Sequence, residues 1–184
     1  MNQITENAAQ LLENVRKTVP LVHNITNYVT VNDAANAVLA IGASPIMADD
    51  IEEAADITAI SNALVLNMGT LNKRTVESML AAGKRANELG VPVVFDPVGA
   101  GASVFRNETA RKITGQVTLS VIRGNLSELS FIAGLGASTK GVDSAQADEK
   151  NDAVSVAKAA AQKLQCVAAL TGALKGLLCH NIAA

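Results

Sequence analysis

The sequence predicts a layered α/β fold with a mostly parallel sheet that helices cover on both faces. Short apolar runs alternate almost strictly with segments in which apolar residues recur every three or four positions. This alternation is typical of parallel strands joined by right-handed helical crossovers. The apolar runs are nearly continuous, as in strands that are buried on both sides. Because the chain has 184 residues, no tandem repeat and no internal linker, we expect residues 1–184 to form a single domain.

The bounds of the elements follow from periodicity and from the residues that start or stop helices. Thr5 is the expected cap of the first helix, and Asp49 and Asp50 are expected to cap the third. Gly42 and Gly90 stand where two helices are expected to end. The expected helices are 5–17, 32–41, 50–60, 72–89, 104–114, 125–133 and 151–164. The expected strands are 21–26, 44–48, 63–67, 91–95, 119–122 and 167–170, with a polar connection at 134–148.

Composition excludes several classes of partner. The net charge of -2 provides no basic surface for nucleic acid or anionic lipid, and an aromatic content of 2% argues against stacking on bases. No apolar run reaches membrane-spanning length, and the first residues lack the pattern of a signal peptide. Cys166 and Cys179 form neither a disulfide framework nor a metal-binding spacing. We therefore expect a cytoplasmic protein with no nucleic-acid or membrane partner.

Polar residues and glycines follow the expected strands. The carboxyl ends of parallel strands share one edge of a sheet, and open α/β sheets bind their ligands there. No P-loop, dinucleotide fingerprint or serine–histidine–acid set accompanies these residues. The residues at this edge are Asn27, Met47, Asn67, Gly69, Thr70, Asp96, Gly99, Gly101, Arg123, Asn125 and Thr171.

Asp96 ends the apolar run 91–95 and precedes Pro97, Gly99 and Gly101. Glycines let a backbone approach phosphate closely, which favours a ligand site. The other interpretation is that Asp96 caps its own turn and the glycines shape that turn. Taken alone, this segment favours the turn.

Asn125 and Glu128 lie one helical turn apart and also allow two interpretations. Carboxylate and amide oxygens at this spacing suit a hydrated Mg²⁺. The same Asn-x-x-Glu pattern is an ordinary capping box, which the pattern alone favours, and both roles are compatible. Arg123 either pairs with phosphate or lies on the surface. Met47 is by default a core residue, and His23 is by default a structural hydrogen-bonding residue.

Five motifs occur together in an order and spacing typical of one family. They are LVHNITN at 21–27, GASPIMA at 42–48, LNMGT at 66–70, FDPVGAGA at 95–102 and IRGNLSE at 122–128. From about residue 8 to residue 172, the chain closely resembles hydroxyethylthiazole kinase, a ribokinase-like enzyme of thiamine salvage.

The resemblance implies a three-layer ribokinase-like fold and transfer of the ATP γ-phosphate to the alcohol of 4-methyl-5-(2-hydroxyethyl)thiazole. It also implies Mg²⁺ as cofactor and a homotrimer with the thiazole pocket at a subunit interface. At Asp96 it reverses the preference for a simple turn. The implied site residues are Asn27, Met47, Gly69 and Thr70 beside the thiazole, Asp96 and Glu128 for Mg²⁺, and Arg123 and Thr171 for ATP.

The resemblance further implies segments after Gly172 that this sequence does not carry. Among them is a Gly-x-Gly-Cys segment opening a helix that stabilises the transferring phosphoryl group. Neither Cys166 nor Cys179 fits this segment, so no catalytic residue is assigned. We therefore expect a truncated or frame-shifted product. A thiazole kinase, a non-catalytic remnant that binds thiazole or oligomerises, and a kinase of a related hydroxymethylpyrimidine stay open as functions.

Overall fold

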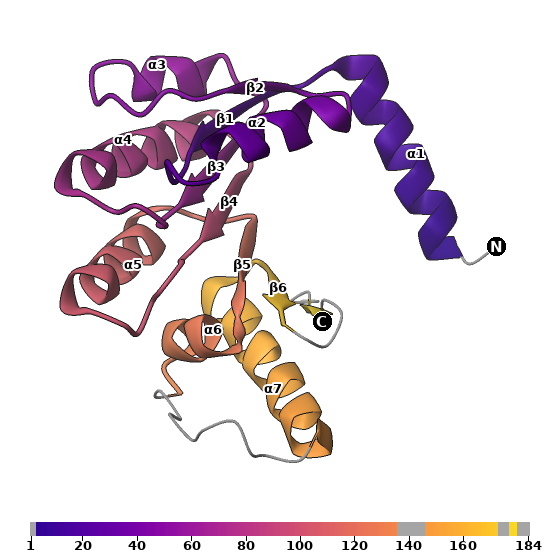
Figure 1. The fold of residues 1–184 in the computed structure, drawn as a ribbon, viewed down its shortest axis with the longest axis vertical. Helices are drawn as coiled ribbons and strands as arrows, with labels where there is room; N and C mark the ends of the chain where they lie inside the picture. Colours follow the sequence, from indigo (N-terminus) through magenta and orange to yellow (C-terminus); the bar gives the residue numbers. More distant parts are fainter. Residues whose placement is uncertain (1–2, 136–145, 173–176, 180–184) are drawn as a thin grey trace.

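One sheet runs through the computed structural model, which describes residues 3–135, 146–172 and 177–179 (Figure 1). Its strand order is β2-β1-β3-β4-β5-β6-β7. Neighbouring strands from β2 to β6 are parallel, and β7 is antiparallel to β6. The strands are β1 (Leu21–Ile25), β2 (Ser44–Ile46), β3 (Ala63–Asn67), β4 (Val93–Asp96), β5 (Val121–Asn125), β6 (Val167–Thr171) and β7 (Leu177–Cys179).

Helices connect the parallel strands, as the alternation predicts. The predicted fold class, a mostly parallel α/β sheet, is therefore confirmed. In Figure 1, α3, α4 and α5 lie along one side of the sheet, and α1 projects away on the opposite side, next to β1 and β2. The helices are α1 (Gln3–Thr18), α2 (Val31–Ala40), α3 (Ala54–Ala59), α4 (Lys73–Leu89), α5 (Val104–Gln116), α6 (Leu126–Ala133) and α7 (Gln146–Leu164).

The core lies between the sheet and helices α4 to α7. Fully buried Leu66 of β3 and Phe95 of β4 belong to one cluster with Met79 of α4 and Ile113 of α5. Each such side chain stabilises the fold by roughly 1.5–3 kcal/mol through its burial. Alternate strand positions such as Val65 are only half-buried, so the two faces of the sheet are covered unevenly in the described residues.

Two predicted helix starts are wrong. α1 begins at Gln3, so Thr5 lies inside the helix and does not cap it. α3 begins at Ala54, and its N-cap, Glu53, makes no side-chain capping bond. The carboxylate of Asp50 instead accepts a hydrogen bond from the Glu52 main-chain N–H at 3.0 Å. An aspartate that bonds the backbone two residues on closes a turn, and this turn delays the helix.

The predicted glycine ends of two helices are confirmed, whereas β4, α7 and β7 differ from the prediction. Gly42 and Gly90 follow α2 and α4 with φ of 96° and 70°, as expected for glycines at helix ends. β4 begins at Val93 because Val91 N–H still bonds Ala86 O of the helix end. β7 was not predicted, α7 begins earlier than expected, and residues 136–145 of the predicted connection lie outside the described residues.

Within the described ranges, no helix combines the length and the apolar character that crossing a membrane requires.

Candidate functional site

The predicted site residues fall into two neighbouring groups along the carboxyl edge of the sheet. The β1–β3 side consists of Asn27, Met47, Gly69 and Thr70, which follow strands β1, β2 and β3. The β4–β6 side consists of Asp96, Arg123, Glu128 and Thr171, which lie on or after strands β4, β5 and β6.

The two sides meet where β3 and β4 pair. Asn67 and Asp96 are register partners at the ends of these strands. The main-chain N–H of Met68 donates to the carbonyl of Asp96 at 3.1 Å. On the far flank, Thr171 is the register partner of Asn125. The parallel register therefore brings both groups to one continuous edge.

Neutral hydrogen bonds hold the β1–β3 side together. The Asn67 side-chain oxygen accepts from the Gly69 main-chain N–H at 2.9 Å and from the Asn27 amide at 3.2 Å. The Thr70 hydroxyl accepts from the Tyr28 main-chain N–H at 3.0 Å. Asn67 was singled out only as a strand-end residue, yet it is the centre of this group.

Gly69 is the point of closest approach on this side. A Cβ at residue 69 would lie 2.5 Å from the Cβ of Asn27 and 2.9 Å from the side-chain oxygen of Asn67. Real Cβ atoms do not approach other atoms so closely, so any larger residue would push the loops after β1 and β3 apart. Glycine is therefore required here for space, since its φ lies outside the left-handed region.

His23 is structural, as predicted, and it supports the segment that carries Met47. Its ring is buried, with Nε2 donating to the carbonyl of Ala48 at 2.6 Å and Nδ1 at 2.9 Å from the Thr58 hydroxyl. Burial lowers the pKa of His23 below its ordinary value, and the bond to Ala48 opposes this shift. Met47, the residue before Ala48, is half-buried at the end of β2.

An exposed charged cluster at the rim was missed by the sequence analysis. The Tyr28 hydroxyl donates to the Asp49 carboxylate in a short hydrogen bond, which raises the pKa of Tyr28. Arg74, at the start of α4, lies 3.3 Å from Asp49 and 3.2 Å from Asp50 and also donates to the Tyr28 hydroxyl. This cluster ties the loops after β1 and β2 to α4. No local pattern signals it, because its bonded partners are 21 to 46 residues apart.

Asp96 is the buried acid of the β4–β6 side, with 8% of its surface exposed. One carboxylate oxygen accepts from Arg123 at 2.7 Å, and no donor of the described residues meets hydrogen-bond geometry with the other, buried oxygen, although the nearby Asn67 side chain also favours the charged form of this carboxyl. Burial raises the pKa of Asp96, and the Arg123 guanidinium opposes the rise. Leaving a buried acceptor unpaired costs roughly 1–3 kcal/mol, so such an atom is a candidate ligand for a cation or its water.

Glu128 forms the predicted capping box and has a second role. Its Oε2 accepts from the Asn125 main-chain N–H at 2.8 Å, and the Asn125 side chain accepts from the Glu128 N–H at 2.9 Å. Its Oε1 accepts from the Gly99 main-chain N–H at 2.8 Å. The charge of Glu128 also contributes to the raised pKa of Asp96.

The Asp96–Glu128 pair fits the demands of Mg²⁺ better than those of a metal held only by protein. In the part of the chain that the structure describes, no group of three or more His, Cys, Asp or Glu residues converges on one point. Mg²⁺ is commonly held by one or two carboxylates, with water and phosphate oxygens completing its octahedron. The two acids and the unpaired oxygen of Asp96 match that pattern.

The glycine loop after Asp96 is a turn shaped by its glycines, as one interpretation of the sequence held, but the Asp96 carboxylate bonds Arg123 and does not cap this turn. Gly99 and Gly101 have φ of 73° and 98°, which favours glycine at both positions. The loop closes on itself through Ala100 N–H to Pro97 O at 2.9 Å and Ala102 N–H to Gly99 O at 3.0 Å. The turn thus presents the Gly99 N–H to Glu128.

Arg106 was not a sequence candidate. From the first turns of α5, it donates to the carbonyls of Met68 and Gly69 after β3 and of Val98 after β4. It contacts both sides of the edge, although no recognisable motif contains it.

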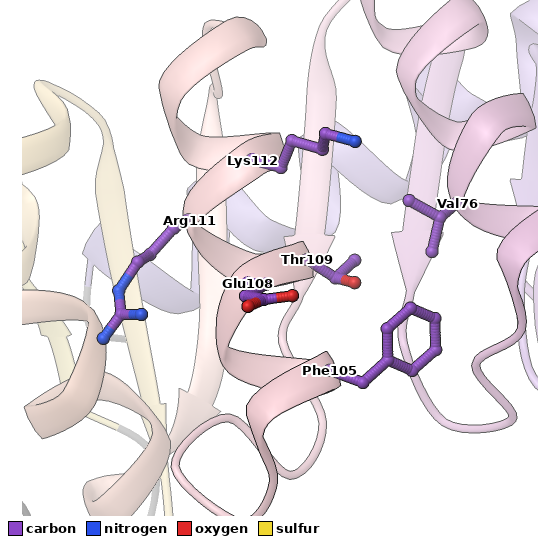
Figure 2. Close-up of a pocket in the computed structure, with 6 residues that line it drawn as sticks. All are labelled: Val76, Phe105, Glu108, Thr109, Arg111 and Lys112. Carbon is purple, nitrogen blue, oxygen red and sulfur yellow. The ribbon is translucent and has the colours of Figure 1, made fainter.

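A separate groove of about 500 Å³ lies between α4 and α5 (Figure 2). Figure 2 shows Phe105 directed toward Val76, while Arg111, which also lines the groove, extends from α5 in the opposite direction. The Arg111 guanidinium lies 5.1 Å from the centre of the Phe131 ring. None of the predicted site residues lines this groove, so it is distinct from the carboxyl edge.

The mostly parallel sheet with ligand-type residues at its carboxyl edge, together with the structural match that follows, places the chain in the ribokinase-like class of α/β folds. A solved structure of a hydroxyethylthiazole kinase protein from Pyrococcus horikoshii OT3 matches with a TM-score of 0.80 and 38% identity, covering 92% of this chain and 61% of that chain. The model of the hydroxyethylthiazole kinase family matches residues 12–177, and the chain belongs to this family.

Curated relatives carry the same name. Hydroxyethylthiazole kinase of Ruminiclostridium cellulolyticum is 65% identical over 175 residues, covering 95% of this chain and 64% of the relative. That of Clostridium beijerinckii is 63% identical over 175 residues, covering 94% of this chain and 63% of the relative. The chain thus spans less than two thirds of the length of these relatives.

Proposed function

We propose that the protein is a kinase that transfers the ATP γ-phosphate to the hydroxyl of 4-methyl-5-(2-hydroxyethyl)thiazole in thiamine biosynthesis. The observation that carries the proposal is the buried, unpaired oxygen of Asp96 beside Arg123, next to a neutral group of strand-end loops. The names of the relatives support the same activity.

The β1–β3 side is suited to an uncharged heteroaromatic alcohol. Asn27 and Thr70 offer amide and hydroxyl groups, and Met47 offers a polarisable thioether that adapts to the face or edge of a ring. The close approach at Gly69 fixes the relative positions of these loops. In this proposal these four residues bind the thiazole.

The β4–β6 side is suited to phosphate and Mg²⁺. Asp96 and Glu128 would hold the ion, which when bound neutralises charge on the phosphates. The Arg123 side chain is 53% exposed, so donors that do not bind Asp96 are open to a phosphate. Thr171, at the end of the neighbouring strand β6, would contact ATP from the flank.

A direct assay tests the activity. The full chain is incubated with ATP, Mg²⁺ and either the thiazole alcohol or a hydroxymethylpyrimidine, and the phosphorylated product is quantified by mass spectrometry. Turnover of the thiazole alcohol that is lost in Asp96→Asn supports the proposal. Preferred turnover of the pyrimidine contradicts it, whereas thiazole binding without turnover would identify this chain as the non-catalytic alternative.

The proposal includes a homotrimer and a cytoplasmic location. Exposed apolar side chains on and around α1 and α2 support self-association, because such groupings commonly mark interaction surfaces. They include Leu11, Val29, Leu39 and Ile41. Sedimentation equilibrium at several protein concentrations tests the trimer, and a monomer at all concentrations would contradict it. Cell fractionation tests the location.

A further inference from the structure

The Arg106 guanidinium joins the two sides of the carboxyl edge. Its Nη2 donates to the Gly69 carbonyl at 2.9 Å, and its Nη1 donates to the Val98 carbonyl at 2.6 Å and to the Met68 carbonyl. Met68 and Gly69 follow β3, whereas Val98 follows β4. One side chain therefore contacts the backbone of both loops.

The charge of Arg106 is not part of an ion pair in the described residues, although its side chain is half-buried. A guanidinium that is directed at neutral carbonyls, and not at a carboxylate, acts through its planar fork of donors. The geometry of the fork, which lysine lacks, is what fits three carbonyls on two loops.

The contacts of Arg106 lead through the glycine loop to Glu128, one of the two acids predicted to hold Mg²⁺. The glycine loop wraps over the arginine, since a Cβ at Gly99 would lie 3.1 Å from its Cδ. The next step is the bond from the Gly99 N–H to Glu128 at 2.8 Å. The neighbouring residue of α5, Asn107, accepts from the Gly101 N–H at 2.7 Å, which holds the other end of the loop.

We propose that Arg106 is a positioning residue that couples thiazole binding on the β1–β3 side to binding of Mg²⁺ and nucleotide on the β4–β6 side. The inference rests on the proposed function and deepens it. Because one guanidinium holds both loops, a ligand that orders one loop also orders the other, and the second ligand then binds more tightly.

The test is a pair of calorimetric titrations. The thiazole alcohol is titrated into the full chain without and with Mg²⁺ and a non-hydrolysable ATP analogue. In the wild type, Mg²⁺ with the analogue is expected to tighten thiazole binding by about fivefold or more. In Arg106→Lys, which keeps the charge but loses the fork, the same factor is expected to fall below about twofold.

Arg111→Lys is the matched control. It makes the same chemical change five residues further along α5, where the guanidinium lies over the ring of Phe131. Its coupling factor is expected to equal that of the wild type. Equal loss of coupling in both variants would overturn the proposal, because it would indicate a general effect of changing α5.

A second measurement uses only the wild type, so it tests the proposal even if the Arg106→Lys variant does not fold. Thiazole titration without Mg²⁺ is expected to shift the amide resonances of Gly99 and Gly101, which lie in the loop after β4. Unchanged resonances at both glycines would overturn the proposal.

The remaining outcomes separate this inference from the proposed function. If the wild type does not bind the thiazole alcohol, both are overturned. If the wild type binds it but Mg²⁺ and the analogue leave its affinity unchanged, or if folded Arg106→Lys keeps the full coupling, only the role of Arg106 is overturned.

Discussion

The β1–β3 side and the β4–β6 side lie along one edge of the same sheet but are built from different interactions. On the β1–β3 side, neutral amides and a hydroxyl bond each other around Asn67, and steric fit at Gly69 sets the spacing. On the β4–β6 side, a buried carboxylate pairs with an exposed arginine and keeps one oxygen unpaired. The difference shows that the fold separates a neutral group of side chains from one that carries charge.

This contrast has an energetic consequence. The β1–β3 side depends on close packing, so damage there is expected to reduce stability and ligand affinity together. The β4–β6 side holds Asp96 at a cost, since its pKa is raised by burial. Neutralising this acid is expected to abolish ion binding while leaving the fold intact.

The largest expected effect is that of Asp96→Asn on Mg²⁺. Affinity for the ion is expected to fall by roughly 100-fold or more, because the change removes the negative charge that the ion requires. Thiazole affinity without Mg²⁺ is expected to stay the same. Calorimetric titration of each ligand measures both. Asp56→Asn, an exposed acid on α3, is the control, and a similar loss of Mg²⁺ affinity there would contradict the assignment.

The next effect is that of Gly69→Ala on the β1–β3 side. The added Cβ meets Asn27 and Asn67, so thiazole affinity is expected to fall, with a loss of about 1–3 kcal/mol in the free energy of unfolding. Mg²⁺ affinity is expected to change little. Urea unfolding and thiazole titration provide the measurements.

Gly115→Ala is the control for this substitution. No atom lies within 4 Å of its added Cβ, and alanine is the better residue in a helix, so a gain of about 0.5–1 kcal/mol is expected. A Gly69→Ala protein as stable as the wild type would show that the contacts around residue 69 are not needed.

A smaller effect concerns pH, because each side contains a buried titratable group with a shifted pKa, and the two shifts have opposite directions. For His23 the folded pKa is lowered, so its contribution to stability is present above pH 6.5 and is lost as pH falls through the folded pKa. For Asp96 the folded pKa is raised, so its contribution is greatest below its ordinary pKa of 3.8 and is lost as pH rises through the raised value.

Melting midpoints between pH 7 and pH 5 are therefore expected to decline as pH falls, and the decline is expected to be shallower in His23→Gln. The same slope in both proteins would show that His23 does not contribute. The contribution of Asp96 is measured separately, with the melting midpoint of Asp96→Asn at neutral pH. This variant is expected to be at least as stable as the wild type.

The smallest expected effect is that of Tyr28→Phe at the rim. The substitution removes the hydroxyl contacts with Asp49 and Arg74 but keeps the main-chain bond to Thr70. Because the side chain is 54% exposed and its partners are solvated, thiazole affinity is expected to change by about twofold or less. A tenfold loss would mean that the cluster contacts the ligand directly.

Much of the fold was predictable because local patterns reflect local physics. Apolar runs between helical segments predicted the six parallel strands, and Asn-x-x-Glu predicted the capping box at residue 125. The start of the third helix was predicted wrongly. Asp50 closes a turn, and it does so with the same side-chain chemistry that would cap a helix. β7, which spans Leu177–Cys179, was not predicted.

The sequence by itself determined the order of the elements and which polar residues follow each strand, since both depend on periodicity and on neighbouring residues. Only the tertiary structure decided that Glu128 also bonds Gly99, that Asp96 keeps an unpaired buried oxygen and that Arg106 reaches Gly69. The contact of Glu128 with Gly99 joins residues 29 positions apart, and that of Arg106 with Gly69 joins residues 37 positions apart. Both arise because parallel pairing of β3, β4 and β5 brings distant loops to one edge. No local pattern encodes that proximity, so the two-sided character of the edge appears only in the folded chain.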